Sequence, residues 1–188
     1  MAKKFQGKYR IPSARARWWN YRNAAAYFIT ICTKNRQHYF GEIINAEMLM
    51  SETGKKVEEE WLKSFELRPD MHLTMDVYQV MPNHFHAIII IGENEYNKDK
   101  SPFDGDLTQK EDLTQKPQNA FGPQYKNLAS IVGGFKGAVT RFAQILMPEF
   151  DWQGRFYDHI IRSEEEFIRI SNYIVTNPAN WGKDKFNI

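Results

Sequence analysis

The fold is decided by the stretch Met81-Pro82-Asn83-His84-Phe85-His86-Ala87-Ile88-Ile89-Ile90-Ile91. Its four closing isoleucines are typical of a central strand that is buried on both faces. Another extended segment, roughly 71–80, comes just before it, and the short link across 81–83 favours an antiparallel hairpin. We therefore predict two neighbouring strands, with residues 84–91 in the interior of a sheet.

The two histidines of this strand are the first candidates for chemistry. Side chains alternate along a strand, so His84 and His86 point to one face and Phe85 points to the other. Two imidazoles fixed at the end of a central strand can both reach one divalent ion. An isolated His-x-His pair is a weak signal, because a histidine is often a hydrogen-bonded core residue. The pair predicts a metal site, with a structural role as the alternative.

The other segments surround this hairpin in a regular order. The predicted elements are a strand over 27–33, a helix capped by Ser51, the two hairpin strands, a helix over 127–146, a strand over 155–162 and a helix that a capping box opens at Ser163. This order predicts an α+β fold, a ferredoxin-like antiparallel sheet (βαββαβ) with helices on one face. The last helix is an addition after that unit.

Length and composition exclude several classes of protein. The chain has 188 residues, of which 42% are apolar and 26% charged, as in an ordinary globular domain. Its longest apolar run is far too short to cross a bilayer, and no secretory signal pattern opens the chain. One cysteine, Cys32, excludes a disulfide framework and a cysteine-based zinc cage. We expect a cytoplasmic protein without membrane contact.

Residues 92–123 differ in composition from the rest of the chain. They contain the pentapeptide Asp-Leu-Thr-Gln-Lys twice, at 106–110 and 112–116, and few apolar residues. Such a segment is predicted to be an exposed insertion, since it cannot bury a core of its own. The expected organisation is a basic N-terminal arm over 1–22 and a single domain over 23–188 that carries this insertion.

Basic residues gather at the start of the chain. The first 41 residues hold nine Lys and Arg and no acid, which leaves 16 basic against 23 acidic residues in the remainder. Cations interleaved with aromatic rings suit single-stranded nucleic acid, because the cations pair with phosphates and bases stack on the rings. A frayed, solvated terminus and an organellar leader are the alternatives. The residues predicted to contact DNA are Arg15, Arg17, Trp18, Trp19, Arg22, Lys34, Arg36, Lys126 and Lys136.

The third predicted helix carries another pair of polar side chains. Tyr173 lies on the flank of the apolar stripe, so its ring can pack while its hydroxyl reaches the edge of the core. Asn177 comes four residues later and lies on nearly the same line along the helix. Because Asn177 precedes Pro178, we expect it to leave helical geometry. A boundary tyrosine and a capping asparagine are the plainer interpretations.

Three motifs together resemble the single-tyrosine HUH transposases, most closely the branch called REP-associated tyrosine transposases. The motifs are Met81-Pro82-Asn83-His84-Phe85-His86, Trp152-Gln153 followed by Phe156-Tyr157-Asp158-His159-Ile160-Ile161-Arg162, and Asn172-Tyr173-Ile174 followed by Asn177-Pro178. Each motif is short, and their order and spacing make the resemblance specific. It covers nearly the whole chain except 92–123.

The resemblance implies metal-dependent nicking and joining of single-stranded DNA at hairpin-bearing sites by an HUH-type catalytic domain. His84 and His86 would hold Mg²⁺ or Mn²⁺, and Asn177 would complete the metal site. Tyr173 would attack a phosphodiester, keep a 5′-phosphotyrosine link and release a 3′-hydroxyl. A monomer and a homodimer both remain open.

Two other functions are compatible with the same residues. A non-catalytic protein on this fold would bind hairpin DNA or RNA without cutting it. A metal-dependent phosphodiesterase would use water as its nucleophile, so it would form no covalent adduct and would survive replacement of Tyr173 by phenylalanine. The chain has no Gly-x-x-x-x-Gly-Lys loop, so no nucleotide cofactor is expected.

Overall fold

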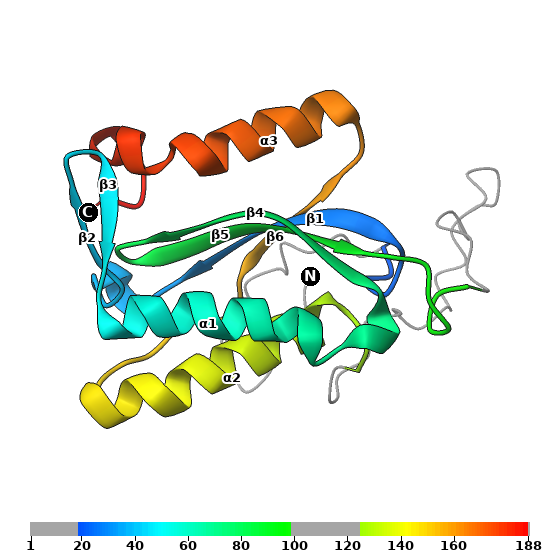
Figure 1. Ribbon diagram of the computed structural model, residues 1–188, viewed down its shortest axis with the longest axis horizontal. Helices are drawn as coiled ribbons and strands as arrows, with labels where there is room; N and C mark the ends of the chain where they lie inside the picture. Colours follow the sequence, from blue (N-terminus) through cyan, green and yellow to red (C-terminus); the bar gives the residue numbers. More distant parts are fainter. Residues whose placement is uncertain (1–18, 99–124, 188) are drawn as a thin grey trace, which may run out of the picture.

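A four-stranded antiparallel sheet forms the centre of the protein (Figure 1). The structure is a computed structural model that describes residues 19–98 and 125–187. The strand order in the sheet is β4-β5-β1-β6. These strands are β1 Ala25–Cys32, β4 Leu73–Met81, β5 His84–Ile91 and β6 Tyr157–Ile161. The predicted α+β class, with its antiparallel sheet and helices, is confirmed.

β5 lies between β1 and β4, as its run of isoleucines predicts. It is antiparallel to both neighbours, and His84 lies opposite Cys32 of β1 and Met81 of β4. Every residue of β5 except Ile90 is buried. The predicted hairpin is confirmed, and it places both histidines at the start of a central strand.

Two helices cover one face of the sheet. α1 (Glu52–Glu66) and α2 (Leu128–Leu146) lie side by side below the sheet in Figure 1. Trp61 of α1 and Phe135 of α2 pack against Phe85 of β5, with ring centroids 5.1 and 5.5 Å away. All three side chains are fully buried. Because burial of one large apolar side chain contributes about 1.5–3 kcal/mol, this aromatic cluster anchors the two helices to the sheet.

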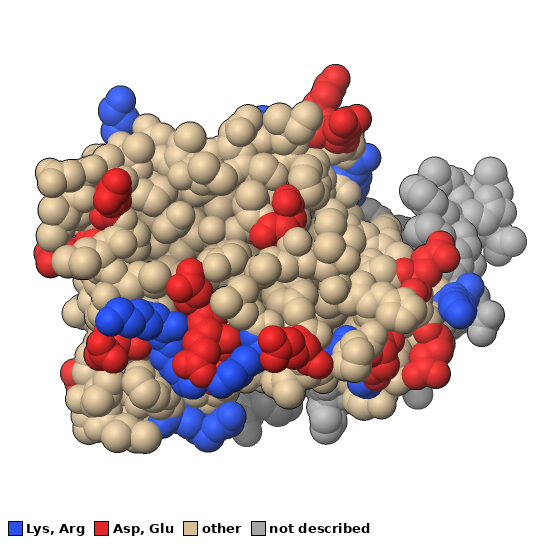
Figure 2. Space-filling view, viewed as in Figure 1, with Lys and Arg blue, Asp and Glu red and all other residues tan. Residues whose placement is uncertain are grey.

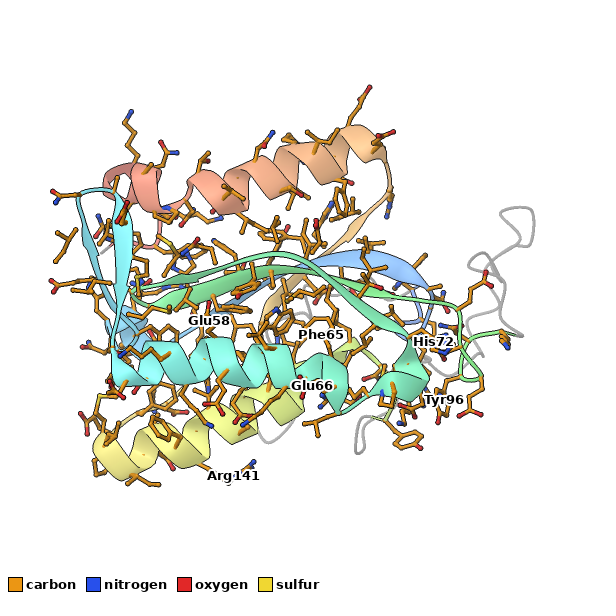
Figure 3. All side chains as sticks on the ribbon, viewed as in Figure 1. Glu58, Phe65, Glu66, His72, Tyr96 and Arg141 are labelled. Atoms are coloured by element: carbon orange, nitrogen blue, oxygen red, sulfur yellow. The ribbon has the colours of Figure 1, made fainter. Side chains whose placement is uncertain are left out.

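α1 begins and packs as its sequence predicts. Ser51 is its N-cap, and the hydroxyl accepts a hydrogen bond of 3.1 Å from the backbone N–H of Gly54. Phe65 packs its ring against the core of the protein, and Glu58 reaches toward β4 (Figure 3). Tyr78 of β4 donates a hydrogen bond of 3.0 Å to the carboxylate of Glu58. The helix is therefore fixed to the sheet by apolar and polar contacts together.

The third helix, α3 (Glu164–Thr176), covers the opposite face of the sheet (Figure 1). Its Ile170 and Ile174 pack with Ile88 of β5 in a second, smaller apolar cluster. A short 3-10 helix, η3 (Pro178–Lys183), follows α3 directly. The chain thus returns to the sheet end at which β5 begins.

The N-terminus of α3 is capped by a different arrangement from the one predicted. Ser163 accepts a hydrogen bond from the N–H of Glu166, as a capping box requires. The carboxylate of Glu166, however, accepts from the N–H of Arg162 and lies 2.8 Å from Nε2 of His159. The second hydrogen bond of a capping box, from the N–H of Ser163 to the Glu166 carboxylate, is therefore absent. The Glu166 carboxylate instead contacts His159 of β6 and the N–H of Arg162.

A two-stranded hairpin, β2 (Gly41–Ile44) and β3 (Glu47–Met50), was not predicted from the sequence. Both of its turn residues are left-handed, Asn45 at φ 51° and Ala46 at φ 66°, as a type I′ turn requires. The backbone just before the hairpin is hydrogen-bonded to the turn between β4 and β5. The hairpin therefore lies at the end of the sheet that carries the histidines.

Charged side chains intermix along α1 on the face shown in Figure 2. Lys56 and Lys63 form ion pairs with Glu59 and Glu60, three or four residues away. Pairs of this kind on a helix surface contribute only about 0.3–0.5 kcal/mol each. This face is therefore a solvated, ion-paired surface. No helix in the described part of the chain is long and apolar enough to cross a membrane.

The described end of the predicted N-terminal arm belongs to the folded core. Trp19 and Tyr21 are buried, and the carbonyl of Tyr21 accepts a hydrogen bond of 3.1 Å from the N–H of Leu128. The earlier part of the arm and most of the predicted 92–123 insertion lie outside the described residues. The boundary placed at residue 22 thus falls inside a segment that packs with the domain.

Candidate metal centre and tyrosine site

Two buried histidines stand side by side at the start of β5. The ring centroids of His84 and His86 are 4.5 Å apart, and both side chains are inaccessible to solvent. Oδ1 of Asn83 lies 2.9 Å from Nδ1 of His84, and Oγ1 of Thr30 lies 2.9 Å from Nδ1 of His86. These partners hold both rings through Nδ1, and where Nδ1 carries the hydrogen, Nε2 is left to accept a hydrogen bond or bind a metal ion.

The amide of Asn83 determines the tautomer of His84. Its Nδ2 donates to two backbone carbonyls, those of Arg36 at 3.1 Å and Phe186 at 2.8 Å. The amide oxygen therefore faces His84 and can only accept, so Nδ1 of that ring carries the hydrogen. Nε2 of His84 is then the unprotonated nitrogen, as metal ligation requires.

Both histidines are held in the neutral form. Burial, aided by the positive charge of Arg36, lowers the pKa of His84 from 6.5 to about 3. Burial and the neighbouring His84 lower the pKa of His86 well below its ordinary value. Since a neutral imidazole is the form that binds a metal ion, both rings are suitable ligands at neutral pH.

The structure brings Tyr173 to these histidines, as the sequence predicts. Its hydroxyl lies 3.3 Å from Nε2 of His86, and its side chain is 40% exposed. Its ring meets the edge of Phe28 with centroids 6.2 Å apart. Burial and the negative charge of Asp184 raise the pKa of Tyr173, while Asn177 lowers it. A half-exposed phenol at this position is accessible from solvent.

Two oxygen-bearing side chains complete the group. Asn177 is buried, and its Nδ2 donates a hydrogen bond of 2.9 Å to Oδ2 of Asp184. Ligand atoms of His84, His86 and Asp184 all lie within 4.8 Å of one another. Within the described part of the chain, Oδ1 of Asn177 and Nε2 of His84 are buried and accept no hydrogen bond. Four potential ligands therefore converge, and two of them carry unused buried lone pairs.

The donor set fits a divalent cation. Two neutral imidazoles with carboxylate and amide oxygens suit Mn²⁺ well and Mg²⁺ acceptably. A buried polar atom without a partner costs about 1–3 kcal/mol, and an ion bound between these atoms would remove that cost. The residues that could hold the metal are His84, His86, Asn177 and Asp184.

The expected departure of Asn177 from helical geometry is wrong. Its φ and ψ are −58° and −42°, which is helical, and its N–H donates to the carbonyl of Ile174 at 3.2 Å. Pro178 is tolerated because it begins η3, and the first helical position suits proline. The Asn177 carboxamide is held by Asp184 at the same time, so contacts at the site outweigh the local preference.

Asp184 was missed by the analysis of the sequence. It follows a 3-10 helix and belongs to no recognisable ligand motif, so no spacing rule connects it to His84, which precedes it by a hundred residues. The ring of Phe186 was missed as well, although it stacks on His84 with centroids 4.6 Å apart. Only the folded chain reveals these two contributions.

The residues predicted to contact DNA are scattered. Arg15, Arg17 and Trp18 lie outside the described residues. Trp19 is buried and donates a hydrogen bond of 3.0 Å to the hydroxyl of Tyr27, which is a core position and not a stacking surface. Arg22 is partly buried near the start of β1. Lys126 is ion-paired with Asp70 and lies over the ring of Tyr96, which Figure 3 shows beside His72.

Three of the predicted basic residues lie around one surface cavity. Lys34 and Arg36 line a cavity of about 550 Å³, together with residues 151–154. Lys136 donates to the carbonyl of Gln153, one of the lining residues, at 3.0 Å. The guanidinium of Arg36 lies 4.3 Å from the centre of the Phe186 ring. Lys34 pairs with Asp151, another lining residue, at 2.9 Å. Of the three cations, Arg36 connects this cavity to the candidate metal centre, because it contacts Phe186 and its carbonyl accepts a hydrogen bond from Asn83.

The loop that carries these cations has unusual backbone geometry. Asn35 and Arg36 have φ values of 54° and 58°, the left-handed region that side chains rarely adopt. Backbone strain of this kind is concentrated at functional sites, because surrounding contacts must hold it in place. Here those contacts include the hydrogen bond from Asn83 to the carbonyl of Arg36.

Comparison with solved structures identifies the fold. The chain superposes on the structure of a REP-associated tyrosine transposase bound to a REP hairpin with a TM-score of 0.56. The alignment covers 93% of this chain and 77% of that protein, at 19% sequence identity. The α+β architecture described above is therefore the fold of that tyrosine transposase.

Sequence comparison identifies the family. No family model matches the chain. An uncharacterized protein of Haemophilus influenzae is 37% identical over 177 residues, which cover 94% of this chain and 92% of the relative. The chain belongs to the same protein family as this Haemophilus influenzae protein.

Proposed function

We propose that the protein is a metal-dependent, single-tyrosine nuclease and strand transferase that acts on single-stranded DNA hairpins. The observation that carries this proposal is the 3.3 Å approach of the Tyr173 hydroxyl to Nε2 of His86, within the convergent group of His84, His86, Asn177 and Asp184. The reaction requires a nucleophile and a phosphate-binding ion close together. Tyr173 is the candidate nucleophile, and the convergent side chains are candidate ligands for the ion.

The chemistry follows from these side chains. The phenolic oxygen of Tyr173 forms a bond to phosphorus while the bond between phosphorus and the 3′-oxygen breaks. The proton of the phenol is balanced by the proton that the released 3′-hydroxyl gains. The product keeps a phosphodiester-like bond to Tyr173, so the strand can be rejoined by attack of a 3′-hydroxyl without a nucleotide cofactor. A bound divalent ion supplies Lewis-acid neutralisation of the scissile phosphate.

The residues proposed to hold the ion are His84, His86 and Asn177, with Mg²⁺ or Mn²⁺ as the metal. The tautomer of His84 and the neutral state of both rings favour ligation through Nε2. Asn177 offers an amide oxygen that accepts no hydrogen bond among the described residues. The chemistry of these donor atoms supports binding of a divalent ion. Tyr173 precedes Asn177 by four residues, so one helical turn separates the proposed nucleophile from a proposed metal ligand.

The basic cavity is proposed to hold the strand next to the reacting phosphate. Lys34 and Arg36 line it, and Lys136 contacts the lining residue Gln153. Cations of this kind pair with phosphates of single-stranded DNA, and Lys34 would exchange its present partner Asp151 for a phosphate. The structural neighbour is bound to a REP hairpin, which supports a hairpin substrate for this chain as well.

Covalent capture tests the proposal. Labelled single-stranded hairpins from the DNA that flanks the gene are mixed with the protein and Mn²⁺ and separated on a denaturing gel. We expect a metal-dependent adduct that is lost in Tyr173→Phe. The matched control is Tyr157→Phe, because Tyr157 is also exposed and also meets the edge of Phe28, at 6.1 Å. This control retains the adduct.

Other outcomes distinguish the rival functions. Cleavage without an adduct, unchanged in Tyr173→Phe, would establish a phosphodiesterase that uses water. Hairpin binding without cleavage would establish a non-catalytic binder. One observation favours the non-catalytic binder. His84 is fully buried and its ring contacts Phe186, so a phosphate has no access to His84 in this conformation.

A further inference from the structure

The C-terminal segment, residues 184–187, is built into the metal centre. Asp184 accepts hydrogen bonds from Nδ2 of Asn177 at 2.9 Å and from the N–H of Phe186 at 2.7 Å. The Phe186 ring is tilted by 50° against the ring of His84, with centroids 4.6 Å apart, and its centroid lies 5.9 Å from that of His86. The guanidinium of Arg36 lies over the same Phe186 ring. The segment thus contacts the site through a carboxylate, an aromatic ring and the backbone.

The carboxylate of Asp184 is placed to bind the ion directly. Each of its oxygens accepts one hydrogen bond and keeps lone-pair capacity, because an ionised carboxylate offers about four acceptor positions. It is the only negatively charged side chain in the group formed with His84 and His86 among the described residues. A divalent cation gains more from a carboxylate than from a neutral amide, so Asp184 is the strongest oxygen ligand available.

The backbone of the same segment orients another ligand. The carbonyl of Phe186 accepts a hydrogen bond of 2.8 Å from Nδ2 of Asn83, whose oxygen accepts from Nδ1 of His84. Partners of this kind, one contact removed from a ligand, fix the ring tautomer and affect metal affinity by roughly 10–100-fold. The segment therefore acts on the site through a ligand and through the orientation of a second ligand.

We infer that Asp184 is a metal ligand, and that metal binding and docking of residues 184–187 stabilise each other. The inference rests on the metal site of the proposed function. Thermodynamic linkage requires the coupling to be reciprocal: an ion that binds more tightly when the segment is docked must also hold the segment in place. The coupling can therefore be measured as an effect of the segment on Mn²⁺ affinity, or as an effect of Mn²⁺ on the docking of the segment.

The first experiment measures Mn²⁺ affinity of the full chain by titration calorimetry. We expect Asp184→Asn, which keeps the side-chain shape and an acceptor for Asn177, to weaken Mn²⁺ binding by roughly tenfold or more. The matched control is Asp76→Asn, an aspartate of β4 that accepts a hydrogen bond of 3.5 Å from Ser171 of α3 and belongs to neither proposed site. Its Mn²⁺ affinity stays at the wild-type value. Circular dichroism checks that both variants are folded.

A second pair of variants separates the carbonyl of Phe186 from its ring. A chain that ends at Lys185 loses the carbonyl that orients Asn83 and is expected to bind Mn²⁺ more weakly. Phe186→Ala keeps the carbonyl and is expected to retain more of the affinity. Equal loss in the two would assign the effect to the ring and would contradict the role of the carbonyl.

Hydrogen–deuterium exchange measures the coupling from the other side. Mn²⁺ is expected to slow exchange of the amides of residues 184–187 in the wild type and to have no effect on them in His84→Asn. Faster exchange with Mn²⁺ would show that the ion displaces the segment and would overturn the inference. Unchanged Mn²⁺ affinity in Asp184→Asn would overturn it while leaving the proposed function intact. Absence of Mn²⁺ binding in the wild type would overturn both.

Discussion

The two faces of β5 are equally buried and chemically opposite. One face presents Phe85 and Ile89 to α1 and α2, where aromatic rings fill the core. The other presents His84 and His86 to Tyr173 and the C-terminal segment, where buried nitrogen and oxygen atoms converge. The packed apolar side chains need no hydrogen-bond partner, whereas buried polar atoms without a partner lower the free energy of unfolding. Along the histidine face, Ile88 still packs with Ile170 and Ile174 of α3, so the two faces differ at the start of β5, where one is wholly apolar and the other gathers polar atoms.

Substitution of Phe85 should produce the largest loss of stability. Phe85→Ala removes a fully buried ring that packs against Trp61 and Phe135, and we expect the free energy of unfolding to fall by about 3–5 kcal/mol. His84→Asn, one position away on the other face, should cost only about 1 kcal/mol, since it gives up one hydrogen bond. Urea denaturation measures both values. Similar losses would contradict the division between the faces.

Addition of Mn²⁺ should stabilise the protein through the histidine face alone. At a concentration one hundred times its dissociation constant, a ligand of the native state raises the free energy of unfolding by about 2.7 kcal/mol. This gain should vanish in His84→Asn and persist in His72→Gln. His72 is exposed and lies at the other end of the sheet, beside Tyr96 in Figure 3. A gain that survives in His84→Asn would place the ion elsewhere.

Acid should destabilise the metal-free protein through the same face. The pKa of His84 is lowered from 6.5 to about 3 in the folded state, so below pH 6.5 the unfolded chain binds more protons than the folded one. Stability is therefore lost as the pH falls, by about 2 kcal/mol for His84 between pH 7.5 and pH 5, and the lowered pKa of His86 acts in the same direction. Thermal or urea unfolding in the presence of a chelator measures the loss. We expect His86→Asn to show a shallower dependence on pH than the wild type.

The sequence predicted the parts of the fold that depend on local pattern. The isoleucine run placed β5 in the middle of the sheet, and alternation put His84 and His86 on one face. Helical periodicity placed Tyr173 on the flank of the apolar stripe of α3, and only the family resemblance implied that this helix lies against the histidines. These features follow from spacing along one element, so one sequence is enough to infer them.

The remaining features depend on contacts between distant segments. The turn of the β2–β3 hairpin uses Asn45 and Ala46, and without glycine it carries only a weak turn signal. Trp19 is hydrogen-bonded to Tyr27 in the core, although it lies between Arg17 and Arg22 in a basic part of the sequence. Asp184 reaches the histidines only because η3 turns the chain back toward β5. Tertiary packing determines each of these three positions, and no local sequence pattern predicts them.

The hydrogen bond between Tyr173 and Nε2 of His86 has a consequence for the order of events. In the tautomer in which Nδ1 of His86 donates to Thr30, Nε2 carries one lone pair. That lone pair could accept the phenol hydrogen or bind an ion, but not both at once. In the proposed function, an ion held by Nε2 of His86 would therefore take the place of the Tyr173 hydroxyl as the partner of this nitrogen. The phenol would lose its resting hydrogen bond only when the charge that neutralises the phosphate is present.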